Sequence, residues 1–144
     1  MATGDGIYLF DTNILSDMMR YPEGTAAQRF IEVVKNKPGA RFCTSVVVQC
    51  ELLFGMRRRT HPLWQTHYER MLESVDVLPL EPDVCIHYAA LRTLLETAGT
   101  PIGPNDALIA AHALAANATL VSADAEFLRV PGLRVENWLA EEST

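Results

Sequence analysis

Residues 102–124, IGPNDALIAAHALAANATLVSAD, contain the pattern that decides the fold. Pro-Asn at 104–105 is a helix start signal, and the Ala-rich run after it predicts a buried helix. Residues 119–121 (TLV) then form a short β-prone run that ends at a turn. Asp106 therefore falls in the first turn of a helix and Asp124 at the carboxyl end of a strand. Ligands bind at that edge of open α/β sheets, so we expect the two carboxylates to meet there.

Strand and helix signals alternate through the rest of the chain. Apolar runs predict strands at 7–10, 41–44, 75–80 (shortened by Pro79) and near 134–136. This alternation implies an α/β fold, with a parallel sheet, right-handed crossovers and helices on both faces. Because no repeat or linker divides residues 1–144, we expect a single domain. Helical spacing of apolar residues occupies the segments 14–19, 26–34, 46–54, 61–72 and 82–95.

The composition indicates a folded, acidic protein. Of its 144 residues, 49% are hydrophobic and 21% charged, which argues for a core and against disorder. The net charge of −6 gives no overall attraction for nucleic acid or an anionic membrane, so a polyanion must be held locally, by a metal or clustered arginines. We see no signal peptide and no apolar tract of spanning length, and expect a soluble cytoplasmic protein with no membrane partner.

The cysteines suggest no metal site or disulfide. Cys43, Cys50 and Cys85 are odd in number, have apolar neighbours and lack Cys-x-x-Cys spacing. We therefore interpret all three as reduced core residues.

Four of the eighteen acids stand out by position. Asp11 follows the first strand, and Asp106 and Asp124 mark the helix and strand ends described above. Taken singly, each aspartate is a cap more often than a catalyst. Glu51 has apolar neighbours on a helix expected to be buried, so it should be salt-bridged, protonated or metal-bound. If the strands at 41–44 and 119–121 flank the first strand, all four acids converge at one sheet edge.

Such a cluster of carboxylates repels itself. Oxygen ligands without histidine or cysteine suit hard cations such as Mg²⁺ or Mn²⁺, which would neutralise the repulsion. A metal held in this way lowers the pKa of bound water and stabilises in-line displacement at phosphorus. The four acids therefore predict metal-dependent phosphodiester hydrolysis.

Five motifs follow one another along essentially the whole chain. They are Asp-Thr-Asn at 11–13, Glu51 within TSVVVQCEL at 44–52, Pro-Asn-Asp at 104–106, Val-Ser-Ala-Asp at 121–124 with Phe127, and VPGLRV at 130–135. In this order they closely resemble the motifs of PIN-domain ribonucleases of the VapC toxin type. The resemblance implies a three-layer α/β/α fold with a central parallel sheet of roughly five strands. It also implies Mg²⁺- or Mn²⁺-dependent cleavage of RNA, a homodimer, and a toxin role restrained by a cognate antitoxin.

The same resemblance assigns roles to individual residues. It implies an acidic metal and catalytic site made of Asp11, Glu51, Asp106 and Asp124. The polar positions that support this site would be Thr12, Asn13 and Ser122, the last of which replaces a commoner threonine and keeps the hydroxyl.

Other polar and aromatic residues have plainer interpretations beside the functional ones. Arg57, Arg58 and Arg59 could bind RNA phosphates, but a solvated basic helix end is the plainer interpretation. Trp64, Tyr68 and Met71 recur at helical spacing, which indicates core or dimer contact before base stacking. We expect His112 to be a packing residue, and Glu126 to lie at the surface rather than on a second metal.

Two other functions fit part of the pattern. A phosphatase of the haloacid-dehalogenase type would use Asp11 as nucleophile, but Asn13 occupies the place of its second aspartate. A non-catalytic RNA- or protein-binding module would use the acids as structural groups. A dinucleotide-binding domain is disfavoured, because no Gly-rich turn follows the first strand.

Overall fold

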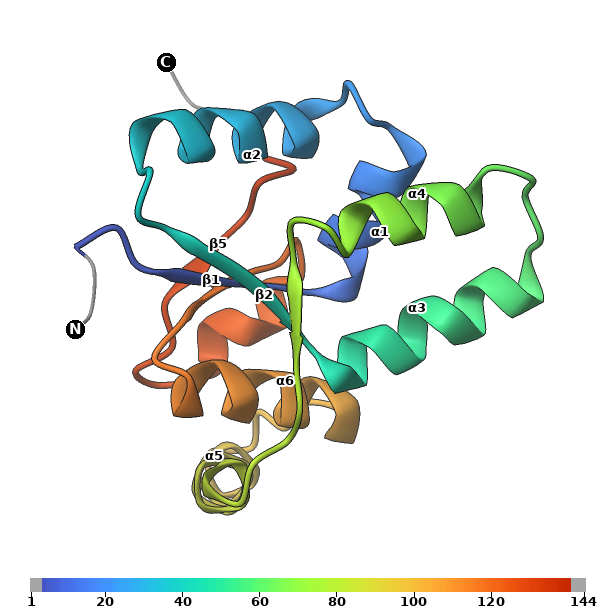
Figure 1. Ribbon diagram of the computed structural model, residues 1–144. Helices are drawn as coiled ribbons and strands as arrows, with labels where there is room; N and C mark the ends of the chain where they lie inside the picture. The colour runs from blue at the N-terminus through green and yellow to red at the C-terminus, as the bar shows by residue number, and fades with distance from the viewer. Residues whose placement is uncertain (1–3, 141–144) are drawn as a thin grey trace.

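The computed structural model describes residues 4–140 and is built around one five-stranded parallel sheet (Figure 1). The strand order is β3-β2-β1-β4-β5, which confirms the predicted parallel sheet and places the first strand between the two expected neighbours. The third strand ends at Leu78, directly before Pro79, which has no N–H for the ladder and shortens the strand as predicted. The strands are β1 (Ile7–Phe10), β2 (Arg41–Ser45), β3 (Asp76–Leu78), β4 (Thr119–Val121) and β5 (Val135–Glu136).

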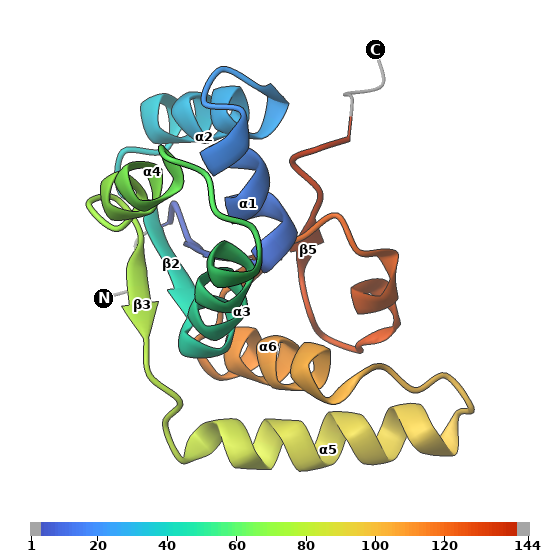
Figure 2. The ribbon, with the colours of Figure 1, turned by 90° about the vertical axis from the view of Figure 1, so that its right-hand side faces the viewer.

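Helices cover both faces of the sheet, as the alternating pattern predicts. In Figure 1, α1, α2 and α4 lie on one side of the sheet and α6 on the other, with α5 outside α6. Figure 2 shows the same layers from the side, and in Figure 1 α3 leads away from the carboxyl end of β2. The helices are α1 (Thr12–Arg20), α2 (Thr25–Asn36), α3 (Val46–Arg58), α4 (Trp64–Met71), α5 (Asp83–Thr97), α6 (Pro104–Ala115) and the short 3-10 helix η1 (Ala125–Arg129).

The two faces of the sheet are packed by different side chains. Alternation along β1 turns Tyr8 and Phe10 toward α2, where their rings contact Phe30, Phe42 and the buried Trp138. On the other side, the alanine-rich α6 is buried along most of its length. Its small side chains let the helix lie close to the sheet, so the position of its first turn relative to the strand ends is firmly fixed.

The register brings three strand ends to one level. Phe10, the last residue of β1, is paired with Thr44 on one side and Val121 on the other. The Asp11 N–H continues this ladder with a 2.9 Å hydrogen bond to the Val121 carbonyl oxygen. The residues that follow β1 and β4 therefore lie side by side, at the edge where the sequence predicts the site.

Two expectations about burial are wrong. Cys43 is buried, but Cys50 and Cys85 are exposed, although all three are free thiols as predicted. The expected burial of α3 is also wrong, because only Val48 and Leu52 of this helix are buried and Phe54 is 62% exposed. The helix runs away from the sheet, so only one side of it has a layer to pack against.

His112 is a packing residue, as predicted. It is buried on α6, and its Nδ1 lies 2.8 Å from the Ser45 hydroxyl oxygen. Burial lowers the pKa of its imidazole. Among the described residues, 4–140, the helices are too short or too polar to cross a bilayer.

Candidate functional site

Asp11 is the buried centre of the candidate site. It caps the N-terminus of α1, where its Oδ1 accepts a 2.8 Å hydrogen bond from the Thr12 N–H. Its side chain lies at the level where β1 and β4 end, and the residue is only 5% exposed. Burial raises the pKa of Asp11, opposed by the hydrogen bonds from Ser122 and Thr12. The charge of Asp124 raises it further.

Ser122 and Asn13 orient Asp11 from the end of β4. The Ser122 hydroxyl donates a 2.7 Å hydrogen bond to Asp11 Oδ2, and its oxygen accepts a 3.0 Å bond from the Asp124 N–H. Asn13 Nδ2 donates to the same Asp11 oxygen at 3.3 Å, and Asn13 Oδ1 accepts from the Ala123 N–H at 3.1 Å. Together these bonds connect the start of α1 to the turn after β4, so Asp11 and Asp124 are held in fixed positions relative to each other.

Glu51 reaches the site from α3. Thr12 Oγ1 donates a 2.8 Å hydrogen bond to Glu51 Oε2. Because Thr12 directly follows Asp11, this bond holds the Glu51 carboxylate next to the start of α1. The residue is half-buried. Among residues 4–140 no lysine or arginine pairs with Glu51, so the salt bridge that was one of the three sequence-based alternatives is wrong for the described chain.

Asp106 lies in the first turn of α6 and carries the strongest electrostatic signature. Burial raises its pKa to about 6, and the charges of Asp11, Asp124, Glu51 and Glu126 contribute in that order. The helix begins at Pro104, whose missing N–H is harmless at a first position. Four other acids therefore lie close enough to Asp106 to raise its pKa beyond the effect of burial.

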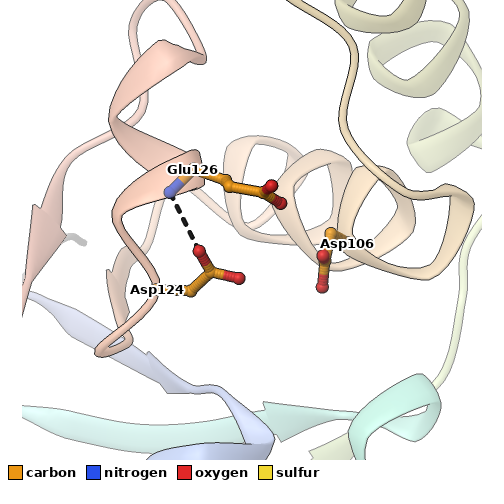
Figure 3. A group of neighbouring side chains, drawn as sticks. All are labelled: Asp106, Asp124 and Glu126. Carbon is orange, nitrogen blue, oxygen red and sulfur yellow. Dashed lines mark hydrogen bonds between the residues drawn. The ribbon is translucent and has the colours of Figure 1, made fainter.

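Asp124 and Glu126 complete the cluster beside Asp106 (Figure 3). Asp124 Oδ1 accepts a 2.9 Å hydrogen bond from the Glu126 N–H and caps η1. One carboxylate oxygen from each of Asp106, Asp124 and Glu126 lies within 4.8 Å of the others. Figure 3 shows the Asp124 and Glu126 side chains turned toward Asp106.

Glu126 lies nearer to the other acids than the surface role favoured from the sequence implies. The residue is half-buried, and one of its carboxylate oxygens lies within 4.8 Å of those of Asp106 and Asp124. A metal contact by Glu126 stays a prediction. Its one sequence signal was its position two residues after Asp124.

The structure therefore gathers the four predicted acids and adds a fifth. The charges of Asp11, Glu51 and Asp124 all act on Asp106. Within residues 4–140 no cationic side chain forms an ion pair with any of the five. Uncompensated carboxylates with oxygen donors alone fit a hard divalent cation such as Mg²⁺ or Mn²⁺, which would take the place of the missing counter-charge.

The three arginines at the end of α3 have different surroundings in the structure. Arg57, Arg58 and Arg59 are all exposed, and the Arg58 guanidinium lies over the Phe54 ring at 5.5 Å. Only Arg59 among them lines a cavity that also includes Thr12 and Glu51. The run is thus a helix end with one residue turned toward the site.

Comparison with known proteins agrees with this geometry. The family described as PIN domain matches residues 8–133. Ribonuclease VapC1 of Haemophilus influenzae is 32% identical over 136 residues, which cover 92% of this chain and 98% of the relative. The tRNA(fMet)-specific endonuclease VapC of Salmonella typhimurium is 32% identical over 120 residues, 75% of this chain and 91% of that protein.

A solved structure has the same fold. The crystal structure of VapBC2 from Rickettsia felis, bound to a DNA fragment from their promoter, contains a chain that superposes with a TM-score of 0.83 at 32% identity. The match covers 92% of this chain and 98% of that one.

Proposed function

This chain belongs to the PIN-domain family of VapC-type ribonucleases, and from that premise we propose that it is a metal-dependent endoribonuclease acting as the toxin of a toxin–antitoxin pair. The observation that carries the proposal is the Asp106 environment. One carboxylate oxygen from each of Asp106, Asp124 and Glu126 lies within 4.8 Å of the others, and no cation of residues 4–140 pairs with them. Burial, together with the charges of Asp11, Asp124, Glu51 and Glu126, raises the Asp106 pKa to about 6. RNA is the proposed substrate and the cytoplasm the proposed site of action.

Asp11, Asp106 and Asp124 would hold the cation, with Glu51 and Glu126 on either side of them. When bound, Mg²⁺ or Mn²⁺ supplies an activated water and charge stabilisation for hydrolysis of a phosphodiester, which leaves 5′-phosphate and 3′-hydroxyl ends. Thr12, Asn13 and Ser122 hold the carboxylates in place through the hydrogen bonds described above. No side chain is required to form a covalent bond to the substrate.

The haloacid-dehalogenase alternative has no support. Its second aspartate would stand at Asn13, whose amide donates to Asp11 and accepts from the Ala123 N–H. The matching family is also a different one.

The test is RNA cleavage by the parent chain and by Asp106→Asn. A panel of RNAs that includes tRNA(fMet) is incubated with Mg²⁺, with Mn²⁺ and with a chelator, and the RNA ends are mapped. We expect metal-dependent cuts by the parent and none by Asp106→Asn, with unchanged circular dichroism in the variant. Metal-independent cutting, or full activity of Asp106→Asn, would overturn the proposal, and absence of cutting on the whole panel would favour a non-catalytic binding module.

An apolar groove suggests where a partner protein binds. It lies between α1, α2 and α4 and encloses about 240 Å³. Because the similar Rickettsia felis chain is part of a VapBC2 complex, we propose that an apolar segment of the cognate antitoxin fills this groove. The groove is lined by Met18, Met19, Pro22, Ala27, Phe30, Ile31, His67, Arg70, Met71, Ser74 and Val75.

The homodimer expected from the resemblance stays a prediction.

A further inference from the structure

A second cavity lies directly beside the acidic cluster. It encloses about 200 Å³ between α1, α3 and the start of α4. Thr12 and Glu51 line it on the side of the acids, and Arg20, Arg59 and Trp64 are also in its wall. Pockets for drug-sized ligands measure about 300 to 1,000 Å³, so this one has room for a single planar group.

Trp64 gives the cavity an aromatic surface. It is the first residue of α4 and half-buried, and the His61 ring stacks near it with centroids 5.8 Å apart. Tyr68, one turn later, is buried and bonded to Gln49, so it belongs to the core as the spacing predicts. Trp64 is different, because it borders an open cavity beside the site.

Two arginines supply positive charge to the same cavity. Arg20 ends α1 and Arg59 follows α3, and both side chains are exposed. Neither forms an ion pair with any residue of the described range, 4–140. A cation at a helix end needs no ligand to explain it. Here, however, two helix ends far apart in sequence direct their arginines to one cavity that also holds an exposed part of an indole.

We propose that this cavity is a subsite for one nucleotide of single-stranded RNA, whose base stacks on Trp64 while the adjoining phosphates bind Arg20 and Arg59. The inference rests on the proposed nuclease function and specifies how its substrate is held. Stacking on an aromatic ring and binding of phosphate by arginine are the two interactions that single strands offer irrespective of sequence. The acids then lie next to the backbone of the same strand.

The subsite explains how an acidic protein holds a polyanion. With a net charge of −6 the chain gives no overall attraction for RNA. Arg20 and Arg59 put positive charge within one nucleotide's reach of Glu51, so binding energy comes from the place where the strand must lie for cleavage.

The experiment measures RNA binding separately from cleavage. A short single-stranded oligoribonucleotide is titrated into the full chain carrying Asp106→Asn, and tryptophan fluorescence and anisotropy are recorded at several salt concentrations. Trp138 is 1% exposed in the core, so quenching reports on Trp64. We expect Trp64→Ala to weaken binding on the order of 10- to 100-fold and Trp64→Phe to restore most of it.

The arginines have a separate signature. In the double variant Arg20→Gln/Arg59→Gln, the plot of log affinity against log salt concentration should become less steep. Its slope should change by about 0.7 for each phosphate that the variant no longer neutralises. Arg41→Gln is the matched control, because Arg41 is exposed at the amino end of β2, away from the site. It should leave affinity and slope unchanged.

The outcomes separate this proposal from the nuclease function. If the parent chain cleaves RNA but Trp64→Ala leaves oligonucleotide affinity and KM unchanged, the subsite is wrong and the nuclease stands. If no RNA is cleaved yet the oligonucleotide quenches Trp64, the subsite stands without the nuclease. An equal loss of affinity in Arg41→Gln, or an effect on antitoxin binding alone, would overturn the subsite.

Discussion

The Thr12 hydroxyl donates a 2.8 Å hydrogen bond to Oε2 of Glu51, which joins α1 to α3 across 39 residues of sequence. This bond fixes a carboxylate on a helix that is otherwise half-exposed and leads away from the sheet (Figure 1). Glu51 keeps its place in the cluster through Thr12, because no cation of residues 4–140 pairs with it.

Replacing Thr12 by valine should therefore weaken the site while keeping the fold. The valine has the same shape but donates no hydrogen bond, so Glu51 loses its orientation. We expect metal affinity to fall roughly tenfold or more, as when other supporting partners of metal ligands are removed. Isothermal titration with Mn²⁺ measures this, and Thr12→Ser should recover the parental affinity. Equal affinities in Thr12→Val and the parent would show that the bond has no such role.

Ser122→Ala should affect both stability and metal binding. The change removes the shortest donor to Asp11 and the acceptor of the Asp124 N–H, so Asp11 Oδ2 keeps only the longer bond from Asn13. Losing these bonds costs about 1 to 3 kcal/mol in the free energy of unfolding. Ser45→Ala is a matched control: Ser45 is also buried and caps α3, a loss of about 0.5 to 2 kcal/mol, but contacts none of the acids. Denaturant melts should show similar losses, with metal affinity reduced only in Ser122→Ala. A parallel reduction of metal affinity in both variants would contradict this.

The parts of the site that could be predicted from sequence are those fixed by strand ends. Asp11 and Asp124 follow buried apolar runs, and Asp106 follows a Pro-Asn helix start, so their convergence follows from the parallel sheet alone. For Glu126 the only signal was its spacing from Asp124, because η1 is only five residues long and has no periodicity. Arg20 gave no signal, since its position near Arg59 depends on how α1 and α3 pack.

Ile31→Glu should prevent antitoxin binding without affecting RNA cleavage. Ile31 lines the apolar groove and is 51% exposed, so a charge there is tolerated by the free protein but not under an apolar segment. Ile86→Glu on α5 is the control, since Ile86 is 73% exposed and outside the groove. Co-purification with the cognate antitoxin gives the readout. Normal complex formation by Ile31→Glu would mean that the antitoxin binds elsewhere.

The free energy of unfolding should depend on pH through Asp106. Without metal it should fall as pH rises, and a bound metal should oppose this fall. The folded-state pKa is about 6 against an ordinary 3.8, so the native protein binds more protons than the unfolded chain between these values. The free energy of unfolding of the metal-free protein should thus fall as pH rises from about 4 to 7. His112 acts in the opposite direction, because burial lowers its pKa and acid must charge it.

The measurement is the difference in Tm between the parent and Asp106→Asn, which removes the contribution of His112. Without metal, Asp106→Asn should be the more stable protein at about pH 8, and the gap should close toward about pH 4. Mg²⁺ or Mn²⁺ should raise the parental Tm most at the higher pH, through preferential binding to the folded state. A metal-induced shift that is equal in Asp106→Asn would show that the cation binds elsewhere.

Glu126→Gln and Glu51→Gln together decide which acid completes the metal site. Glu126 has an oxygen within 4.8 Å of those of Asp106 and Asp124, whereas Glu51 reaches the cluster through Thr12. We therefore expect Glu126→Gln to reduce Mn²⁺ affinity more than Glu51→Gln does. Because it removes one neighbouring negative charge, it should also lower the pKa of Asp106, which NMR titration of the metal-free protein can follow. Glu32→Gln on the exposed side of α2 should change neither quantity. If Glu51→Gln abolishes metal binding and Glu126→Gln does not, the cation lies between α1 and α3, on the side of the RNA subsite.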